Sequence, residues 1–174
     1  MELTLGDVLI PSREIGSKVS FLAGRIAEEY GCELPVFVAL LTGSFIFCSD
    51  LVRQFNQSIQ VCFIKASSYS GTCTTGKVTV TGLDGLNLKD QRVLIVEDIV
   101  DTGLTLNSVV ESIKQKSPKD VKVVSLLDKP SRRKVDFTPD FVGFSIPDFF
   151  VVGYGLDCNE QYRNLPDIHQ MRIG

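Results

Sequence analysis

Basic residues are not in excess in this sequence. Eighteen Lys and Arg residues stand against 21 Asp and Glu residues, a formal net charge of −3 at pH 7. Proteins that bind nucleic acid through its phosphates need a positive field. The composition therefore argues against nucleic acid as a partner, and a small anionic substrate would need local help from backbone amides, a metal ion or a few cations.

Long apolar runs are also absent. The longest clean run covers residues 36–41, far short of the roughly 20 residues that a membrane-spanning helix needs. The N-terminal segment carries Glu2 and Asp7 and shows no basic stretch followed by an apolar one, so no signal peptide is predicted. We expect a cytoplasmic protein with no membrane partner.

The cysteines lack the close spacing that is typical of zinc and redox sites. Their number is odd, and they are Cys32, Cys48, Cys62, Cys73 and Cys158. We interpret them as buried free thiols in a reducing compartment. The single histidine, His169, is interpreted as a surface residue.

The sequence does contain an alternation of apolar runs and helical patterns. Ser12 is the predicted N-cap of a first helix, whose apolar residues recur at helical spacing up to a stop at Gly31. Continuous apolar runs are typical of strands that are buried on both faces. The predicted strands cover residues 36–41, 59–66, 77–81, 93–96 and 121–127, with further apolar segments at 141–146 and 150–152, and the later helices cover 45–55 and about 105–116.

This alternation predicts an α/β fold, a mainly parallel twisted sheet flanked by helices. No internal repeat, low-complexity tract or linker is visible, so residues 1–174 are predicted to form a single domain. Ligands in such folds bind beyond the carboxyl ends of the strands. The residues that follow each apolar run are therefore the candidates for function.

The segment VLIVEDIVDTGLT at residues 93–105 is the most informative. Glu97 and Asp98 close a buried strand, and a loop with hydroxyl groups and Gly103 then leads into a helix. Backbone N–H groups at such a loop form an anion-binding site, and the carboxylates suit ribose hydroxyls or a hydrated Mg²⁺. The simpler alternative is that Asp98 or Asp101 only caps the helix, which does not explain two adjacent charges at the end of an apolar strand.

This segment resembles the phosphoribosyl-pyrophosphate signature of the type I phosphoribosyltransferases. Other segments are similar to the hypoxanthine-guanine branch of that family, in the same order along the chain: LLTGSFIFCSDLVR at 40–53, LLDKP at 126–130 and PDFFVVGYGLDCNEQYRNLPDI at 147–168. The resemblance implies that family's fold, with a small hood over the base site. It also implies purine salvage, in which 5-phosphoribosyl 1-pyrophosphate and a 6-oxopurine give IMP or GMP and pyrophosphate.

The resemblance assigns the sugar-phosphate site. Asp101 corresponds to an acid near purine N7 and is the candidate catalytic base. Glu97 and Asp98 would face the ribose hydroxyls and a first Mg²⁺, and Asp157 corresponds to the ligand of a second Mg²⁺. The residues expected to bind 5-phosphoribosyl 1-pyrophosphate are Leu41, Thr42, Gly43, Glu97, Asp98, Asp101, Thr102, Gly103, Leu104, Thr105 and Arg163.

The base site follows in the same way. Lys129 corresponds to the lysine that donates to the 6-oxo group, and Phe150 to the ring that stacks on the base. The backbone of Val151 would read the purine edge, and Asp157 belongs to the same pocket. Taken alone, Lys129 would be a solvated strand-end lysine, Phe150 a core residue and Asp157 a turn residue.

The segment SSYSGTCTTG at 67–76 is predicted to be a loop and resembles the family's mobile lid, with Ser68 and Tyr69 as its serine–tyrosine pair. Lid closure would keep water from the activated ribose. The resemblance also implies a cis peptide bond between Leu41 and Thr42. Thr42 stands where many relatives carry lysine or arginine, and Cys158 where tyrosine is common, which leaves the contacts of the expected homodimer or homotetramer open.

Two other functions are weighed against this one. A regulator with the same fold that binds nucleic acid would need a basic face or an added DNA-binding domain. A phosphoribosyltransferase for orotate or uracil is disfavoured by Lys129 together with Phe150 and Val151. The sequence does not rank hypoxanthine, guanine and xanthine.

Overall fold

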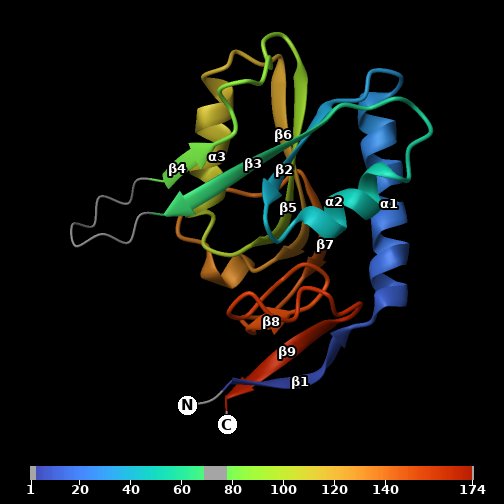
Figure 1. Ribbon diagram of the computed structural model, residues 1–174. Coiled ribbons are helices and arrows are strands. Elements are labelled where there is room, and N and C mark those ends of the chain that lie inside the picture. The colour runs from blue at the N-terminus through green and yellow to red at the C-terminus, as the bar shows by residue number, and fades with distance from the viewer. Residues whose placement is uncertain (1–2, 69–77, 174) are drawn as a thin grey trace.

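The computed structural model describes residues 3–68 and 78–173. Its centre is a six-stranded sheet in the order β4-β3-β2-β5-β6-β7 (Figure 1). Neighbouring strands are parallel, except that β4 is antiparallel to β3. The strands are β2 (Val36–Leu41), β3 (Val61–Ser68), β4 (Val78–Thr81), β5 (Arg92–Val100), β6 (Asp120–Asp128) and β7 (Phe141–Ser145). The predicted α/β fold is confirmed.

Helices cover both faces of this sheet, because its central strands are apolar on both sides. In β2, Phe37 and Ala39 belong to one buried cluster, while Val36 and Val38 belong to the other. The first cluster packs under α1 and α2, and the second packs under α3, on the opposite side in Figure 1. The helices are α1 (Ser12–Tyr30), α2 (Phe45–Val52) and α3 (Leu104–Lys114), and a short 3-10 turn, η1, covers Pro130–Arg132.

A second, antiparallel sheet forms the expected hood. Its order is β1-β9-β8, with bounds Leu3–Ile10 for β1, Ile168–Ile173 for β9 and Val151–Val152 for β8. It joins the first and last strands of the chain, below the main sheet in Figure 1. Ile10 and Ile168 are buried in the cluster under α1, which anchors the hood to the body of the protein.

One prediction from the sequence is wrong in this region, and another holds only in part. Ser12 is the first residue of α1 and not its N-cap, and Pro11 at the cap position offers no side-chain hydrogen bond. The Ser12 amide donates instead to Asp167 Oδ1 at 2.6 Å. His169, predicted at the surface, is half-buried in β9, with Nδ1 3.2 Å from the carbonyl oxygen of Gly6.

Of the other predicted boundaries, one holds and two differ. Gly31 ends α1 as predicted, with a φ of 61° that a glycine adopts without cost. α2 ends at Val52, earlier than predicted. β5 continues to Val100, which pairs with Asp128 of β6, so Glu97 and Asp98 lie inside the strand instead of after it.

The cysteine prediction holds in part. Among the described residues Cys48 and Cys62 are buried free thiols, Cys32 is exposed and Cys158 is half-buried. Cys73 lies outside the described residues. No helix in residues 3–68 and 78–173 is both long and apolar enough to cross a membrane.

Candidate active site

The two carboxylates at the end of β5 serve two neighbouring pockets. Successive residues of a strand point to opposite sides. Glu97 accordingly lines a pocket with the loop that enters α3, and Asp98 lines a pocket with Lys129. We call these the loop pocket and the Lys129 pocket. Ile99 and Asp101 line both, so the two hollows adjoin.

The loop pocket has a volume of about 170 Å³ and is formed by the end of β5, the connecting loop and the start of α3. Gly103 has a φ of 79°, and a Cβ there would lie 3.0 Å from Arg133 Cδ and from Val135 Cγ2. A side chain would therefore be both strained and crowded at this turn. The described lining is Glu97, Ile99, Val100, Asp101, Thr102, Gly103, Thr105 and Leu106, which includes most of the loop that the sequence assigned to the 5′-phosphate.

Burial penalises the charged form of both carboxylates. Glu97 Oε2 is buried without a hydrogen-bond partner among the described residues. Burial, followed by the charge of Asp98, raises the pKa of Glu97 well above its ordinary value. Burial also raises the pKa of Asp98 to about 6, although the amides of Ile99 and Asp98 itself and the charge of Arg163 oppose the shift. A cation placed here would relieve both penalties.

A third segment closes over Asp98. The Leu41–Thr42 peptide bond is cis, as the resemblance implied. A Cβ added to Gly43 would lie 1.7 Å from Asp98 Oδ2, so the loop backbone lies directly against that carboxylate. Ser44 is fully buried and donates from Oγ to the carbonyl oxygen of Leu40 at 2.7 Å, which ties the loop back to β2.

The Lys129 pocket, of about 250 Å³, brings the predicted base-binding residues together. It contains Asp98, Ile99, Asp101, Lys129, Phe150, Val151, Leu156 and Asp157. The Lys129 side chain is 7% exposed and lies beyond the carboxyl end of β6. Phe150 is 48% exposed, which makes it available to a flat ligand and not a core residue. Val151 begins β8.

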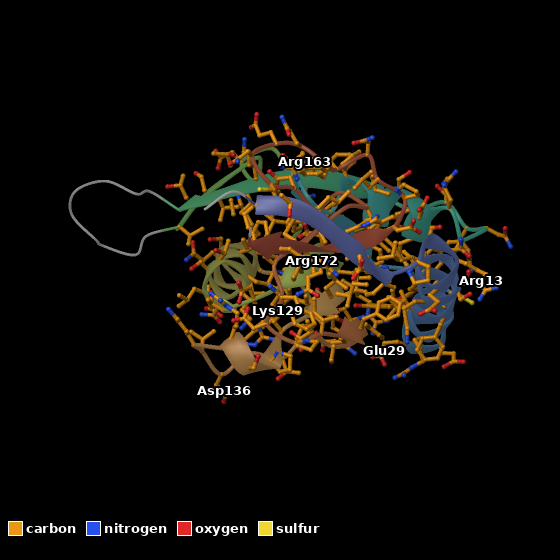
Figure 2. The ribbon with its side chains drawn as sticks, turned by 90° about the horizontal axis from the view of Figure 1, so that it is seen from below. Arg13, Glu29, Lys129, Asp136, Arg163 and Arg172 are labelled. Atoms are coloured by element: carbon orange, nitrogen blue, oxygen red, sulfur yellow. The ribbon has the colours of Figure 1, made fainter. Side chains whose placement is uncertain are left out.

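Asp157 and Arg163 form an ion pair at the edge of this pocket. Arg163 Nη2 lies 2.8 Å from Asp157 Oδ1, and Arg163 Nη1 donates to the carbonyl oxygen of Gly155 at 2.8 Å. Asp157 Oδ2 accepts from the amide of Glu160, also at 2.8 Å. In Figure 2, viewed from the hood side, Arg163 and Lys129 lie on opposite sides of β9. Arg163 therefore lies away from Lys129.

Comparison with known proteins decides the family. Residues 9–159 match the phosphoribosyl transferase domain. The chain is 47% identical over 164 residues to the hypoxanthine phosphoribosyltransferase of Salmonella typhimurium, covering 92% of each chain. It is 41% identical over 169 residues to the hypoxanthine-guanine phosphoribosyltransferase of Bacillus subtilis, covering 97% of this chain and 94% of the relative. This chain belongs to the phosphoribosyltransferase family.

A crystal structure of the phosphoribosyltransferase family shares the whole architecture. The hypoxanthine-guanine phosphoribosyltransferase of Bacillus anthracis superposes with a TM-score of 0.91 at 43% identity, covering 99% of this chain and 100% of that one. The fold that the sequence predicted is therefore that of solved phosphoribosyltransferases, including the strands of the hood.

The structure adds residues that the sequence analysis of this phosphoribosyltransferase missed. Arg132 Nε lies 2.7 Å from Asp101 Oδ1, and Arg132 Nη1 lies 3.1 Å from Asp148 Oδ2. Arg133 donates to the carbonyl oxygen of Asp101 at 2.5 Å and pairs with Asp128. The adjacent arginines in SRRK, directly after the LLDKP segment, were the available signal.

Some predicted site residues stay untested. Ser68 ends β3, and Tyr69 lies outside the described residues, so the predicted lid is not described. Leu104 is exposed at the start of α3. Within the described residues no group of three or more His, Cys, Asp or Glu side chains is arranged to hold a metal ion. A metal bound here would take the rest of its ligands from substrate and water, as Mg²⁺ commonly does.

Proposed function

We propose that this phosphoribosyltransferase transfers the phosphoribosyl group of 5-phosphoribosyl 1-pyrophosphate to hypoxanthine or guanine, with xanthine as a further candidate. The observation that carries the proposal is the Lys129 pocket, where Asp101, Lys129 and Phe150 meet beside the loop pocket. The products are IMP or GMP and pyrophosphate. The names of the relatives support the same activity.

The loop pocket suits the 5′-phosphate. The N-terminus of α3 presents backbone N–H groups that have no partner within the helix, and the helix dipole favours an anion there. The hydroxyls of Thr102 and Thr105 lie in the same lining. Gly103 allows the backbone to approach the phosphate closely. These features support a binding site for the 5′-phosphate on residues 101–105.

The Lys129 pocket suits a 6-oxopurine. Phe150 offers an exposed ring for stacking. Lys129 would donate to the 6-oxo group, and Asp101 would accept the proton from N7 as the base attacks C1 of the ribose. Such glycosyl transfers pass through an oxocarbenium-like state, which the negative charge of Asp98 and its neighbours would stabilise. Each role agrees with the polarity of the side chain assigned to it.

Mg²⁺ fits the carboxylates at the end of β5. Glu97 Oε2 has no hydrogen-bond partner among the described residues, and the Asp98 carboxylate accepts a hydrogen bond from the Ile99 amide at 2.9 Å. We assign Glu97 and Asp98 to a first ion and Asp157 to a second. Mg²⁺, when bound, supplies positive charge against the pyrophosphate leaving group. The pyrophosphate would also be contacted directly by the protein, through Arg163, Thr42 and the amide of Gly43.

Several further predictions belong to this proposal. They are a lid at Ser68 and Tyr69, a single domain over residues 1–174, a cytoplasmic location and a homodimer or homotetramer. The exposed rings of Phe45 on α2 and Phe63 on β3 offer apolar surface that such an assembly would cover.

The test is product identification. The protein, 5-phosphoribosyl 1-pyrophosphate, Mg²⁺ and hypoxanthine or guanine are incubated, and the nucleotide and pyrophosphate are measured by mass spectrometry and a coupled assay. Equal amounts of nucleotide and pyrophosphate are expected. Failure to form a nucleotide, together with binding to duplex DNA, would favour the regulator instead.

A further inference from the structure

Four charged side chains of alternating sign form a continuous chain behind the Lys129 pocket. Arg132 Nε lies 2.7 Å from Asp101 Oδ1, and Arg132 Nη1 lies 3.1 Å from Asp148 Oδ2. Asp148 Oδ1 in turn lies 3.8 Å from Lys129 Nζ. The two ends of the chain are Asp101 and Lys129, the groups assigned to the proton and to the 6-oxo atom of the base.

The two middle residues lie outside the base pocket. A larger hollow of about 530 Å³ opens beneath the hood, and all four charged residues line it together with Phe150. Of the four charged residues, only Asp101 and Lys129 also line the Lys129 pocket. Arg132 and Asp148 therefore contact the base-handling groups from behind, without facing the base themselves.

The shape of the purine explains why a chain of contacts between Asp101 and Lys129 is useful. N7 and the 6-oxo atom are neighbours on one edge of a purine, so Asp101 and Lys129 must keep a fixed separation to contact both at once. The two residues come from different segments, the loop after β5 and the end of β6. A guanidinium presents its N–H groups in a rigid planar fork, which allows Arg132 to hold two carboxylates in a set geometry.

Stability does not account for the two ion pairs that Arg132 makes. The side chains of Arg132, Asp101 and Asp148 are 43%, 41% and 50% exposed. Exposed ion pairs contribute little to folding, since water and salt screen them and ordering long side chains costs entropy. A network of this kind beside a reacting group acts mainly on where that group points.

We propose that Arg132 and Asp148 are positioning residues that set the separation of Asp101 and Lys129 for reading the N7 and 6-oxo edge of the purine. The inference rests on the proposed function. Loss of Arg132 releases Asp101, and loss of Asp148 releases Lys129, so either change breaks the chain and lowers turnover of the oxopurine. The KM for 5-phosphoribosyl 1-pyrophosphate changes little, because residues 101–105 bind its phosphate through backbone amides.

Steady-state kinetics with hypoxanthine test this in Arg132→Ala, Arg132→Lys, Asp148→Asn and the double variant Arg132→Ala/Asp148→Asn. Each single loss is expected to lower kcat at least tenfold, in the range typical of a misplaced general base. Arg132→Lys recovers part of this, since an ammonium can pair with one carboxylate but lacks the fork. The double variant loses less than the product of the two single losses, because both disrupt one chain.

Lys134→Ala is the matched control, because it removes an exposed cation two residues away. Its kinetics and the thermal midpoints of all variants are expected to stay close to wild type. The positioning role would be overturned if Arg132→Ala and Asp148→Asn had the same kinetics as Lys134→Ala. It would also be overturned if their losses of kcat followed a fall in thermal midpoint. A wild-type protein inactive on every oxopurine would overturn the proposed function and this inference together, whereas an active wild type with unchanged variants overturns the inference alone.

Discussion

The backbone of Gly43 lies against the carboxylate of Asp98, and a Cβ at Gly43 would be 1.7 Å from Asp98 Oδ2. Gly155 lies on the other side of the same loop, where a Cβ would be 2.2 Å from the carbonyl oxygen of Gly43. The loop after β2, the end of β5 and the segment after β8 thus meet without room for a side chain at either glycine. This contact holds the amides of the loop next to the carboxylates.

Gly43→Ala should therefore damage the site more than the fold. The new methyl group must displace either the loop or Asp98, and a shift of about 1 Å at a reacting centre can cost roughly a hundredfold in rate. We expect kcat/KM for 5-phosphoribosyl 1-pyrophosphate to fall at least tenfold. Gly24→Ala is the control, since a Cβ there meets nothing within 4 Å. Equal kinetics in the two variants would show that the contact has no role.

Asp98→Asn should stabilise the protein at neutral pH in the absence of Mg²⁺. Burial raises the pKa of Asp98 from 3.8 to about 6. Between these values the folded state binds more protons than the unfolded state, so the free energy of unfolding falls as pH rises from about 4 to about 6. The amide has no charge to desolvate and escapes this loss, which amounts to at most about 3 kcal/mol.

Urea unfolding at pH 4 and pH 7.5 measures this difference. The free energy of unfolding of Asp98→Asn is expected to exceed that of wild type at pH 7.5 and to approach it at pH 4. Asp136→Asn serves as the control, because Asp136 is exposed at the periphery of the molecule (Figure 2). The same gain in free energy of unfolding in Asp136→Asn, or no such gain in Asp98→Asn, would contradict the burial argument.

Lys129→Ala should weaken hypoxanthine and guanine together and narrow their advantage over adenine. Hypoxanthine and guanine present an acceptor at position 6, whereas adenine presents an amino group. Loss of a hydrogen bond from a charged donor costs roughly 1.5–3 kcal/mol, about tenfold to a hundredfold in affinity or rate. The KM values for each base and for 5-phosphoribosyl 1-pyrophosphate, measured in wild type and in Lys129→Ala, show which substrate the lysine contacts. A variant that kept its oxopurine preference but lost 5-phosphoribosyl 1-pyrophosphate would move Lys129 to the phosphate side.

Asp167→Ala should lower the thermal midpoint by releasing the start of α1. Hydrogen bonds from the Ser12 amide and side chain lower the pKa of Asp167. Stability from this contact is therefore present above the ordinary pKa of 3.8 and is lost as pH falls through the lowered value. Asp167→Asn keeps an acceptor and should recover part of the loss. Asp84→Ala, at an exposed position, is the control. Equal thermal midpoints in Asp167→Ala and Asp84→Ala would mean that the hydrogen bond to the start of α1 is not needed.

The sequence predicted the main sheet because its signals are local. The central strands appear as mostly apolar segments, and residues 93–105 carry the carboxylates and the loop in a single segment. The predicted base-binding residues meet in one pocket for the same reason, since each follows its own strand or adjoins the hood.

The parts that were missed depend on partners far away in the chain. β1 is exposed along most of its length and shows no apolar alternation, and it pairs with β9 at the opposite end of the sequence. The cap of α1 comes from Asp167, 155 residues after Ser12. The partners of Arg132 depend on the turn at Pro130–Arg132 and on Asp148 beyond β7. Local patterns carry no information about such contacts.

The most direct test of the account is the rate with a panel of bases. Initial rates are measured by ultraviolet absorbance with 5-phosphoribosyl 1-pyrophosphate, Mg²⁺ and hypoxanthine, guanine, xanthine, adenine, orotate or uracil. We predict that kcat/KM for hypoxanthine, guanine or both exceeds that for adenine by roughly a hundredfold, as expected when a buried donor is left unpaired, and that neither pyrimidine reacts. Preferred turnover of adenine, orotate or uracil, or no turnover of any base, would contradict it.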